Sequence, residues 1–234
     1  GSYDPNHPFA GRDPRMAMTI IYPGMDWNGT VVNTLDKTIN GKDNANYPPS
    51  ANNASKTALT WRKYLDEQYA NGIWNTNACP IVIRYAEVLL TYAEAVNELS
   101  GPSADVYDKL DLIRGRVGMP KVDREKYASK ETLRRLIRRE RGVELAGEGV
   151  RRADILRWKD DNGKMVAETV LNGVLERVVG TVNYAETDPT KRAEIDTNAP
   201  ATDKKIEDRV FKVHNRYNPI PQGAIDNNPN LEQN

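Results

Sequence analysis

The chain has 234 residues, enough to bury a sizeable core, and its 33 basic residues balance its 33 acidic ones. This balance gives no support to a nucleic-acid function, because no net charge attracts the chain to a polyanion. A single cysteine, Cys79, excludes an internal disulfide and a cysteine-based zinc site, and no apolar run approaches the roughly 18 residues that cross a bilayer.

Residues 1 to 77 are rich in Asn, Pro, Gly and Thr, which predicts short extended pieces joined by loops. The apolar runs Met18–Ile21 and Leu59–Tyr64 are the candidates for these extended pieces. The N-terminus shows no cleavable signal, and the chain starts in polar, Pro-rich sequence. We therefore expect the chain to be a fragment of a longer protein.

A long helix is expected from about Pro80 to Leu99, because a proline favours its entry and Gly101-Pro102 follows its end. When its residues are placed at about 100° each, apolar side chains fall on two opposite sides, with a narrow polar stripe between them. A helix of this kind packs between other helices. We interpret the glutamates of the polar stripe as solvated residues, not as ligands.

A second helix is expected from Ser103, a plausible N-cap, to about Val117, before Gly118 and Pro120. The short connection to the preceding helix predicts an antiparallel pair of helices, similar to one tetratricopeptide-like unit. A single pair does not establish such a repeat, because no second copy recurs at a fixed period.

A third helix is expected from about Ser129 to Ala146, and a shorter one from Val150 to Lys159. Glu140 and Glu144 fall on the apolar side of the third helix. Buried carboxylates need hydrogen-bond donors, since an isolated buried charge costs several kcal/mol. The candidate donors are Arg114, Arg116, Arg151 and Arg152.

Two functional interpretations of this third helix are less favoured. A glycosidase needs two carboxyl groups on either side of a sugar in an open groove, and residues one turn apart on a core-facing side are not arranged in that way. The basic run from Arg134 to Arg141 lacks the interleaved aromatic residues that stack on bases. We expect a structural network around the acids and a solvated basic face.

The sequence becomes polar again after Asp160. Asn172-Gly173 lies between the apolar-rich arms of Val166–Val178 and predicts a β-hairpin with a type I′ turn. Residues 210–234 contain several prolines and should be extended. The predicted fold class is mainly α, an α/α helical array with a tetratricopeptide-like helix pair, long loops and a small β-hairpin.

Five segments, taken in chain order, resemble sequence blocks of the SusD/RagB family of nutrient-binding proteins. They are Arg12–Met16 with Thr19-Ile20, Ile83–Leu90 with Ala93–Ala95, Ile113–Gly118, a spaced block within Ile137–Trp158, and a spaced block within Pro219–Asn234. The chain departs from the family pattern at Gly142, Gly147 and Ala224, which bears on local helix packing. On this resemblance, residues 1–234 are expected to form a C-terminal domain, without the N-terminal helical repeats and the lipid-bearing cysteine of full-length members.

The resemblance implies a surface-exposed lipoprotein of the outer membrane in the Bacteroidetes. Such a protein captures a glycan, or in the RagB branch a peptide, and passes it to a SusC-like TonB-dependent transporter. It implies no enzymatic activity, no cofactor and no nucleic-acid partner, and contact with the membrane only through a lipid anchor absent from this chain. A glycoside hydrolase and a purely structural helical scaffold are the alternatives from other functional classes.

Aromatic faces that stack on sugars, with polar side chains around them, are the expected ligand contacts. Because the family's ligand residues lie in variable loops, we choose candidates from their position alone. Trp27, flanked by Tyr22 and Asn28 in a Gly- and Asn-rich loop, is the first candidate, with simple loop packing as an equal alternative. Trp74, in the loop 71–77, is the second, although packing is the favoured interpretation there.

The remaining tryptophans, Trp61 and Trp158, lie within or near the family blocks and are expected in the core. His7 and His214 are isolated, and no nucleophile signature or phosphate-binding loop is present. The sequence therefore predicts no catalytic residue and no metal ligand.

Overall fold

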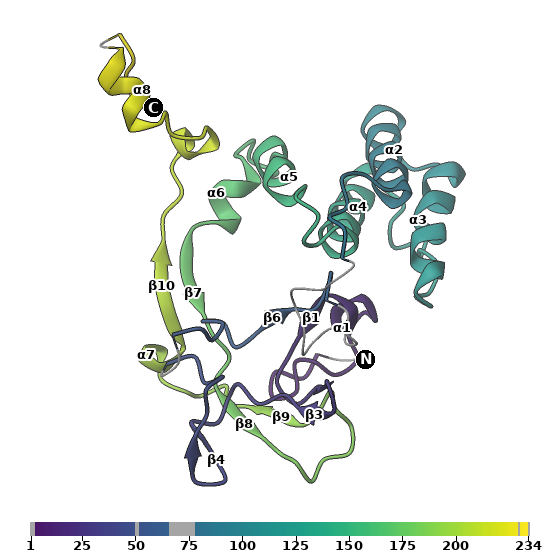
Figure 1. The fold of residues 1–234 in the computed structure, drawn as a ribbon. Helices are drawn as coiled ribbons and strands as arrows, with labels where there is room; N and C mark the ends of the chain where they lie inside the picture. Colours follow the sequence, from purple (N-terminus) through teal and green to yellow (C-terminus); the bar gives the residue numbers. More distant parts are fainter. Residues whose placement is uncertain (1–2, 50–51, 66–77, 229, 234) are drawn as a thin grey trace. The chain divides into compact units, whose positions relative to one another are not determined.

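The computed structural model describes residues 3–49, 52–65, 78–228 and 230–233, and it is mainly helical (Figure 1). The chain divides into two compact parts. The first part comprises Gly1–Arg151 and Arg177–Lys204, and the second comprises Arg152–Glu176 and Lys205–Asn234.

Three helices of the first part form its helical layer: α2 (Tyr85–Ser100), α3 (Ala104–Arg116) and α4 (Lys130–Glu144). Helix α2 packs against both α3 and α4 (Figure 1). Ser103 is the N-cap of α3, as predicted, and its side chain accepts a hydrogen bond from the Val106 amide. Helix α2 begins five residues later than predicted, because the Arg84 backbone is extended and precedes the first helical turn.

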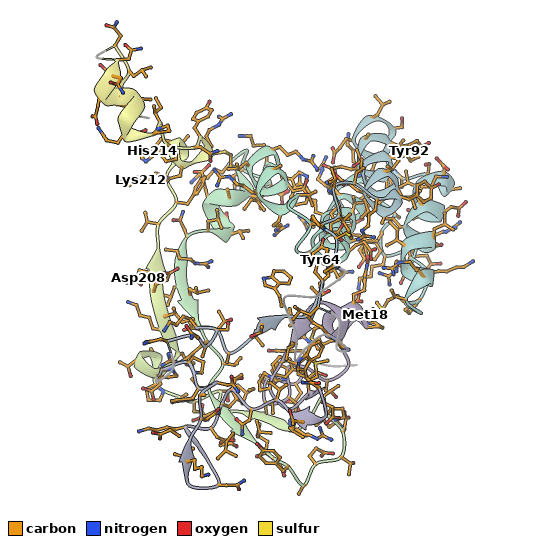
Figure 2. The ribbon with its side chains drawn as sticks, in the orientation of Figure 1. Met18, Tyr64, Tyr92, Asp208, Lys212 and His214 are labelled. Carbon is orange, nitrogen blue, oxygen red and sulfur yellow. The ribbon has the colours of Figure 1, made fainter. Side chains whose placement is uncertain are left out.

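The helical layer encloses one apolar core. Its buried residues are Leu89, Leu90 and Ala93 of α2, Val106, Tyr107, Leu110 and Ile113 of α3, Leu133, Leu136 and Ile137 of α4, and Val122 and Leu145. The prediction that α2 is buried on two sides is wrong in part. Helix α2 packs between α3 and α4 and Leu89 is buried, but Tyr85 is 71% exposed and Leu99 is 85% exposed on the same side as Leu89. Tyr92, on the same side of α2, is also exposed (Figure 2).

Helix α4 starts with a reciprocal cap between Ser129 and Thr132. The Ser129 side chain accepts a hydrogen bond from the Thr132 amide at 3.2 Å, and the Thr132 hydroxyl accepts one from the Ser129 amide at 3.2 Å. These bonds satisfy two amides that have no partner inside the helix.

Replacing this cap should destabilise the helical layer modestly. Ser129→Ala removes the acceptor of the Thr132 amide, so the free energy of unfolding should fall by about 1 kcal/mol. Ser129→Asp restores an acceptor at the same position and should keep wild-type stability. Urea unfolding followed by circular dichroism measures both, and equal losses in the two variants would contradict the assignment of the cap.

The rest of the first part consists of short strand pairs and loops, as predicted for the N-terminal segment. Helix α1 (Arg15–Thr19) leads into β1 (Ile20–Ile21), which pairs with β6 (Thr60–Trp61) in an antiparallel ladder. The other elements are β2 (Asp26–Trp27) with β3 (Thr30–Val31), β4 (Thr38–Ile39) with β5 (Lys42–Asp43), β8 (Gly180–Val182) with β9 (Ala193–Ile195), and α7 (Ala201–Lys204). A second apolar core joins residues 9–58 to residues 182–193.

The second part contains α5 (its residues 152–157), α6, β7, β10 and two short C-terminal helices. Their bounds are α5 Arg151–Arg157, α6 Val166–Val170, β7 Gly173–Glu176, β10 Lys205–Arg209, η3 Val213–Arg216 and α8 Gln222–Asn227. Trp158 is buried, which confirms its predicted place in a core. The prediction that residues 210–234 are extended is wrong in part, because Pro221 serves as the N-cap of α8 and starts a helix.

The predicted hairpin at Asn172-Gly173 is wrong. The first arm is helix α6, and β7 pairs instead with β10, about 30 residues further along the chain (Figure 1). The Asn172 side chain donates to the Glu168 carbonyl at 2.6 Å and accepts from the Phe211 amide at 2.6 Å. Asn172 thus binds the end of α6 to the segment after β10, a role that a local turn signal does not reveal.

Candidate functional site

Two buried acids lie at the centre of the first part. Helix α4 places Glu140 and Glu144 one turn apart, and each is only 2% exposed. The Arg15 guanidinium donates to both, at 2.8 Å to Glu140 and 3.0 Å to Glu144. One arginine from helix α1 therefore bridges the two carboxylates.

Three further arginines complete the neutralisation of these acids. Arg114 pairs with Glu140, while Arg84 and Arg116 reach Glu144 at 2.7 and 2.8 Å. The predicted donors Arg114 and Arg116 are confirmed. Arg152 is not a donor here, because its guanidinium lies 3.3 Å from the Asn215 carbonyl and from Asn218 in the second part. The guanidinium of Arg151, also a candidate, lies beside Gly142.

Arg15 and Arg84 are donors that the sequence did not predict. Both stand in segments that resemble family blocks, which is the one signal that could have drawn attention to them. Their distance along the chain from Glu144, 129 and 60 residues, places them beyond any helical periodicity.

The network extends to the C-terminal end of α4. Lys63 donates to the carbonyls of Glu144 and Ala146 at 3.1 and 3.0 Å and pairs with Glu148. Arg84 also pairs with Glu148, at 2.7 Å, and donates to the Glu144 carbonyl. These cations satisfy carbonyls that lack partners in the last turn and oppose the negative end of the helix dipole.

Arginines and a lysine lower the pKa values of three acids in the network, Asp13, Glu144 and Glu148. Burial by itself would raise the pKa of Glu144, but the hydrogen bonds from Arg84 and Arg15 outweigh it, so this pKa lies below its ordinary value. The pKa of Glu148 is lowered in the same way by Arg84 and Lys63, and the hydrogen bond from Arg15 lowers the pKa of Asp13. The expected structural network around Glu140 and Glu144 is confirmed.

The first predicted ligand residue, Trp27, lies in the β2–β3 hairpin and is half-buried. The Arg62 guanidinium stands 5.1 Å from the centroid of its ring. On the other end of the same short strand, Asp26 pairs with Arg192 at 2.7 Å. We call these four residues, Asp26, Trp27, Arg62 and Arg192, the Trp27 corner.

The other predicted ligand residues lie in different surroundings. Tyr22 is a core residue, stacked on Phe9 with ring centroids 4.7 Å apart, so its ring is not presented to a ligand. Asn28 is exposed and opens the two-residue turn of the hairpin with φ of 47°, ahead of Gly29 at 73°. Trp74 lies outside the described residues.

A pocket of about 470 Å³ adjoins the charged network on the side of helix α1. Most of its wall is apolar, with Phe9, Met16, Ile20 and Val143 among the lining residues. Arg12, Asp13 and Arg15 supply the charged part of the wall. We call this cavity the α1 pocket.

The prediction that Trp61 is a core residue is wrong, because this side chain is 54% exposed. Trp61 lies opposite Ile20 in the β1–β6 ladder, and its ring packs over Gly147, about 3.4 Å from the position that a Cβ there would take. The long-range pairing of β1 with β6 brings Trp61 to the surface at the end of α4, which a local sequence block does not determine.

A family model confirms the resemblance seen in the sequence. The model of the SusD family, SusD_RagB, matches residues 1–234. The chain belongs to the SusD family. This membership agrees with the mainly helical fold and its small antiparallel strand pairs.

Individual relatives are consistent with this membership. A SusD-like protein of Formosa agariphila, named P25, is 34% identical over 154 residues, which cover 61% of this chain and 29% of that protein. The crystal structure of a SusD-like carbohydrate-binding protein from Bacteroides fragilis is 30% identical, with a TM-score of 0.72 over 98% of this chain and 43% of that one. A second SusD-like protein of B. fragilis is 25% identical, with a TM-score of 0.67 over 97% of this chain and 39% of its own.

The chain thus spans less than half the length of these relatives. Within the described ranges, no helix has the length and apolar character to cross a membrane. Over the same ranges, no three or more His, Cys, Asp or Glu residues are grouped so that they could hold a metal ion.

Proposed function

We propose that this chain is the C-terminal domain of a glycan-binding protein that captures oligosaccharides at the bacterial surface. The observation that carries the proposal is the likeness of 98% of the chain to a SusD-like carbohydrate-binding protein, at 30% identity and a TM-score of 0.72. Membership of the SusD family over the whole chain supports the same function.

The protein binds its glycan without cleaving it. Glu140 and Glu144 are the two acids considered as a catalytic pair. Both are buried, and each contacts at least two guanidinium groups. Neither faces the other across an open groove, as hydrolysis of a glycosidic bond requires. This arrangement supports a bracing role for the acids.

The Trp27 corner is the proposed place of contact with the glycan. An indole ring offers an apolar face to the C–H face of a pyranose, and charged side chains beside it can bind the hydroxyl groups. Arg62 fixes one side of Trp27, Asp26 and Arg192 lie on the flanking strand, and Asn28 is exposed at the turn. Such a flat, partly fixed aromatic residue loses little conformational entropy on binding.

The full protein delivers the glycan to a SusC-like TonB-dependent transporter in the outer membrane. A lipid anchor holds the full protein at that surface. No cofactor takes part, because the proposed contacts are stacking and hydrogen bonding alone.

A binding panel tests this function. Maltohexaose, cellohexaose, a galacturonic acid hexamer and a mixed hexapeptide library are titrated against the protein by calorimetry and tryptophan fluorescence. At least one hexasaccharide should bind with micromolar to millimolar affinity and release no reducing ends. Binding of peptides alone would assign the protein to peptide uptake, and the absence of any binding would overturn the proposal.

Trp27→Ala locates the contact within this panel. It should weaken binding of the hexasaccharide about tenfold, which corresponds to about 1.4 kcal/mol. Tyr85→Ala is the matched control, because Tyr85 is an exposed aromatic residue on α2, outside the Trp27 corner. An unchanged affinity in Trp27→Ala would remove the Trp27 corner from the glycan site.

A further inference from the structure

We propose that Trp61 and the α1 pocket form a second subsite for a sugar residue, separate from the Trp27 corner. The inference rests on the proposed glycan-binding function and adds a subsite to it. It starts from an unusual observation, an indole that is 54% exposed yet held in place by two separate segments of the chain. A flat ring that is both exposed and fixed in place can stack on a sugar with little loss of conformational entropy.

Two features of the backbone fix Trp61. The β1–β6 ladder holds its Cα opposite Ile20, and residues 62 and 63 continue the contact through amide hydrogen bonds to the Thr19 carbonyl at 2.9 and 3.2 Å. On the other side, the ring packs over Gly147, whose φ of +76° and lack of a side chain leave room for it. One face of the ring is therefore supported by protein while much of the side chain remains open to solvent.

The α1 pocket lies next to residues that hold Trp61 in place. Two of its lining residues are immediate neighbours of the Trp61 contacts: Ile20 is the cross-strand partner of Trp61, and Ala146 precedes Gly147. The volume of about 470 Å³ lies within the range of about 300–1,000 Å³ that is usual for small-molecule sites. Its apolar wall matches the C–H face of a pyranose.

The charged part of the wall offers hydrogen-bond donors to such a ligand. The Arg12 Nε donates to the Pro8 carbonyl at 2.6 Å, and the guanidinium stacks over Tyr3 at 4.7 Å. Across the described part of the chain, the terminal nitrogens of Arg12 donate to no protein acceptor, which leaves them for sugar oxygens. The Asp13 carboxylate is already engaged by Arg15, through contacts of 2.5 and 2.9 Å.

The subsite is therefore expected to take one sugar ring, stacked against Trp61, with oxygen atoms directed to Arg12. Hydroxyl oxygens and a uronic carboxylate are both suitable acceptors for a guanidinium. The three hexasaccharides of the panel distinguish hydroxyl from carboxylate acceptors, because only the galacturonic acid hexamer carries carboxylates.

Substitutions of Trp61 test the subsite with whichever of the three hexasaccharides the wild-type protein binds. Trp61→Ala should weaken the affinity at least tenfold, whereas Trp61→Phe, which keeps a flat ring, should weaken it less than threefold. Tyr85→Ala again serves as the exposed aromatic control. Urea unfolding of each variant establishes that the fold is retained, as the exposure of Trp61 leads us to expect.

A second measurement covers the case in which Trp61→Ala does not fold. In the Trp27→Phe variant, the hexasaccharide should still protect tryptophan fluorescence from quenching by acrylamide, and Trp61→Phe in that background should abolish the protection. Two outcomes would overturn the subsite while leaving the proposed function intact, provided that the wild-type protein binds a hexasaccharide. One is an unchanged affinity in Trp61→Ala, and the other is that the hexasaccharide gives no protection from quenching in Trp27→Phe. If no hexasaccharide binds the wild-type protein, the proposed function fails and the subsite fails with it.

Discussion

Glu144→Gln should lower the free energy of unfolding by about 3–5 kcal/mol, the usual cost of removing one partner of a buried ion pair. Three guanidinium groups, those of Arg15, Arg84 and Arg116, converge on this carboxylate within 3.0 Å. A neutral amide of the same shape leaves these cations without their counter-charge and turns an NH₂ group toward N–H donors.

The measurement is urea unfolding at neutral pH, with Glu131→Gln as the matched control. Glu131 lies on the same helix but is exposed, so its substitution should change stability by about 0.5 kcal/mol or less. A loss in Glu144→Gln no larger than that of Glu131→Gln would show that the network does not brace the fold.

Acidification should destabilise the protein through the same network. The pKa values of Asp13, Glu144 and Glu148 lie below their ordinary values of 3.8 for Asp and 4.5 for Glu. Below those ordinary values the unfolded chain binds protons that the folded protein does not, so stability falls as the pH falls. The contribution is complete above about pH 5 and is lost as the pH passes down through the lowered values, at about 1.4 kcal/mol for each unit of difference in pKa.

The Glu144→Gln variant supplies the control for this pH dependence. This variant lacks one of the carboxyl groups whose pKa is lowered in the folded protein. Its free energy of unfolding should therefore change less than that of the wild-type protein between pH 6 and pH 3. Denaturant unfolding at a series of pH values measures both curves. An equally steep loss in the variant would assign the acid sensitivity to groups other than Glu144.

Together these results would distinguish the structural role of the buried acids from the proposed glycan-binding role of the aromatic residues. The acids hold α1, α2, α3 and α4 together through Arg15, Arg84, Arg114 and Arg116, while the proposed ligand contacts are aromatic residues on short strands. A variant of Trp27 or Trp61 can therefore alter glycan affinity without disturbing the network, and Glu144→Gln tests stability without touching the aromatic surface.

Several features followed from the sequence because their causes are local. Ser103 caps α3 as predicted, since a cap depends only on the side chain and the amide three residues later. The inward position of Glu140 and Glu144 followed from the 3.6-residue period of the helix. The family likewise followed from short blocks in a fixed order, and the family model confirms it.

The tertiary structure alone decided which distant segments meet. Arg15 reaches Glu144 across 129 residues, β10 takes the place of the predicted partner of β7, and β6 carries Trp61 to the surface. Tyr22 and Trp61 both come from segments with aromatic and apolar residues, yet one is buried and the other is exposed. Periodicity and turn signals act over a few residues, whereas the choice of a partner depends on which surfaces the folded chain brings together. The sequence by itself therefore determined the helices, the inward acids and the family, and the packing of distant segments determined the donors around those acids and the surfaces available to a glycan.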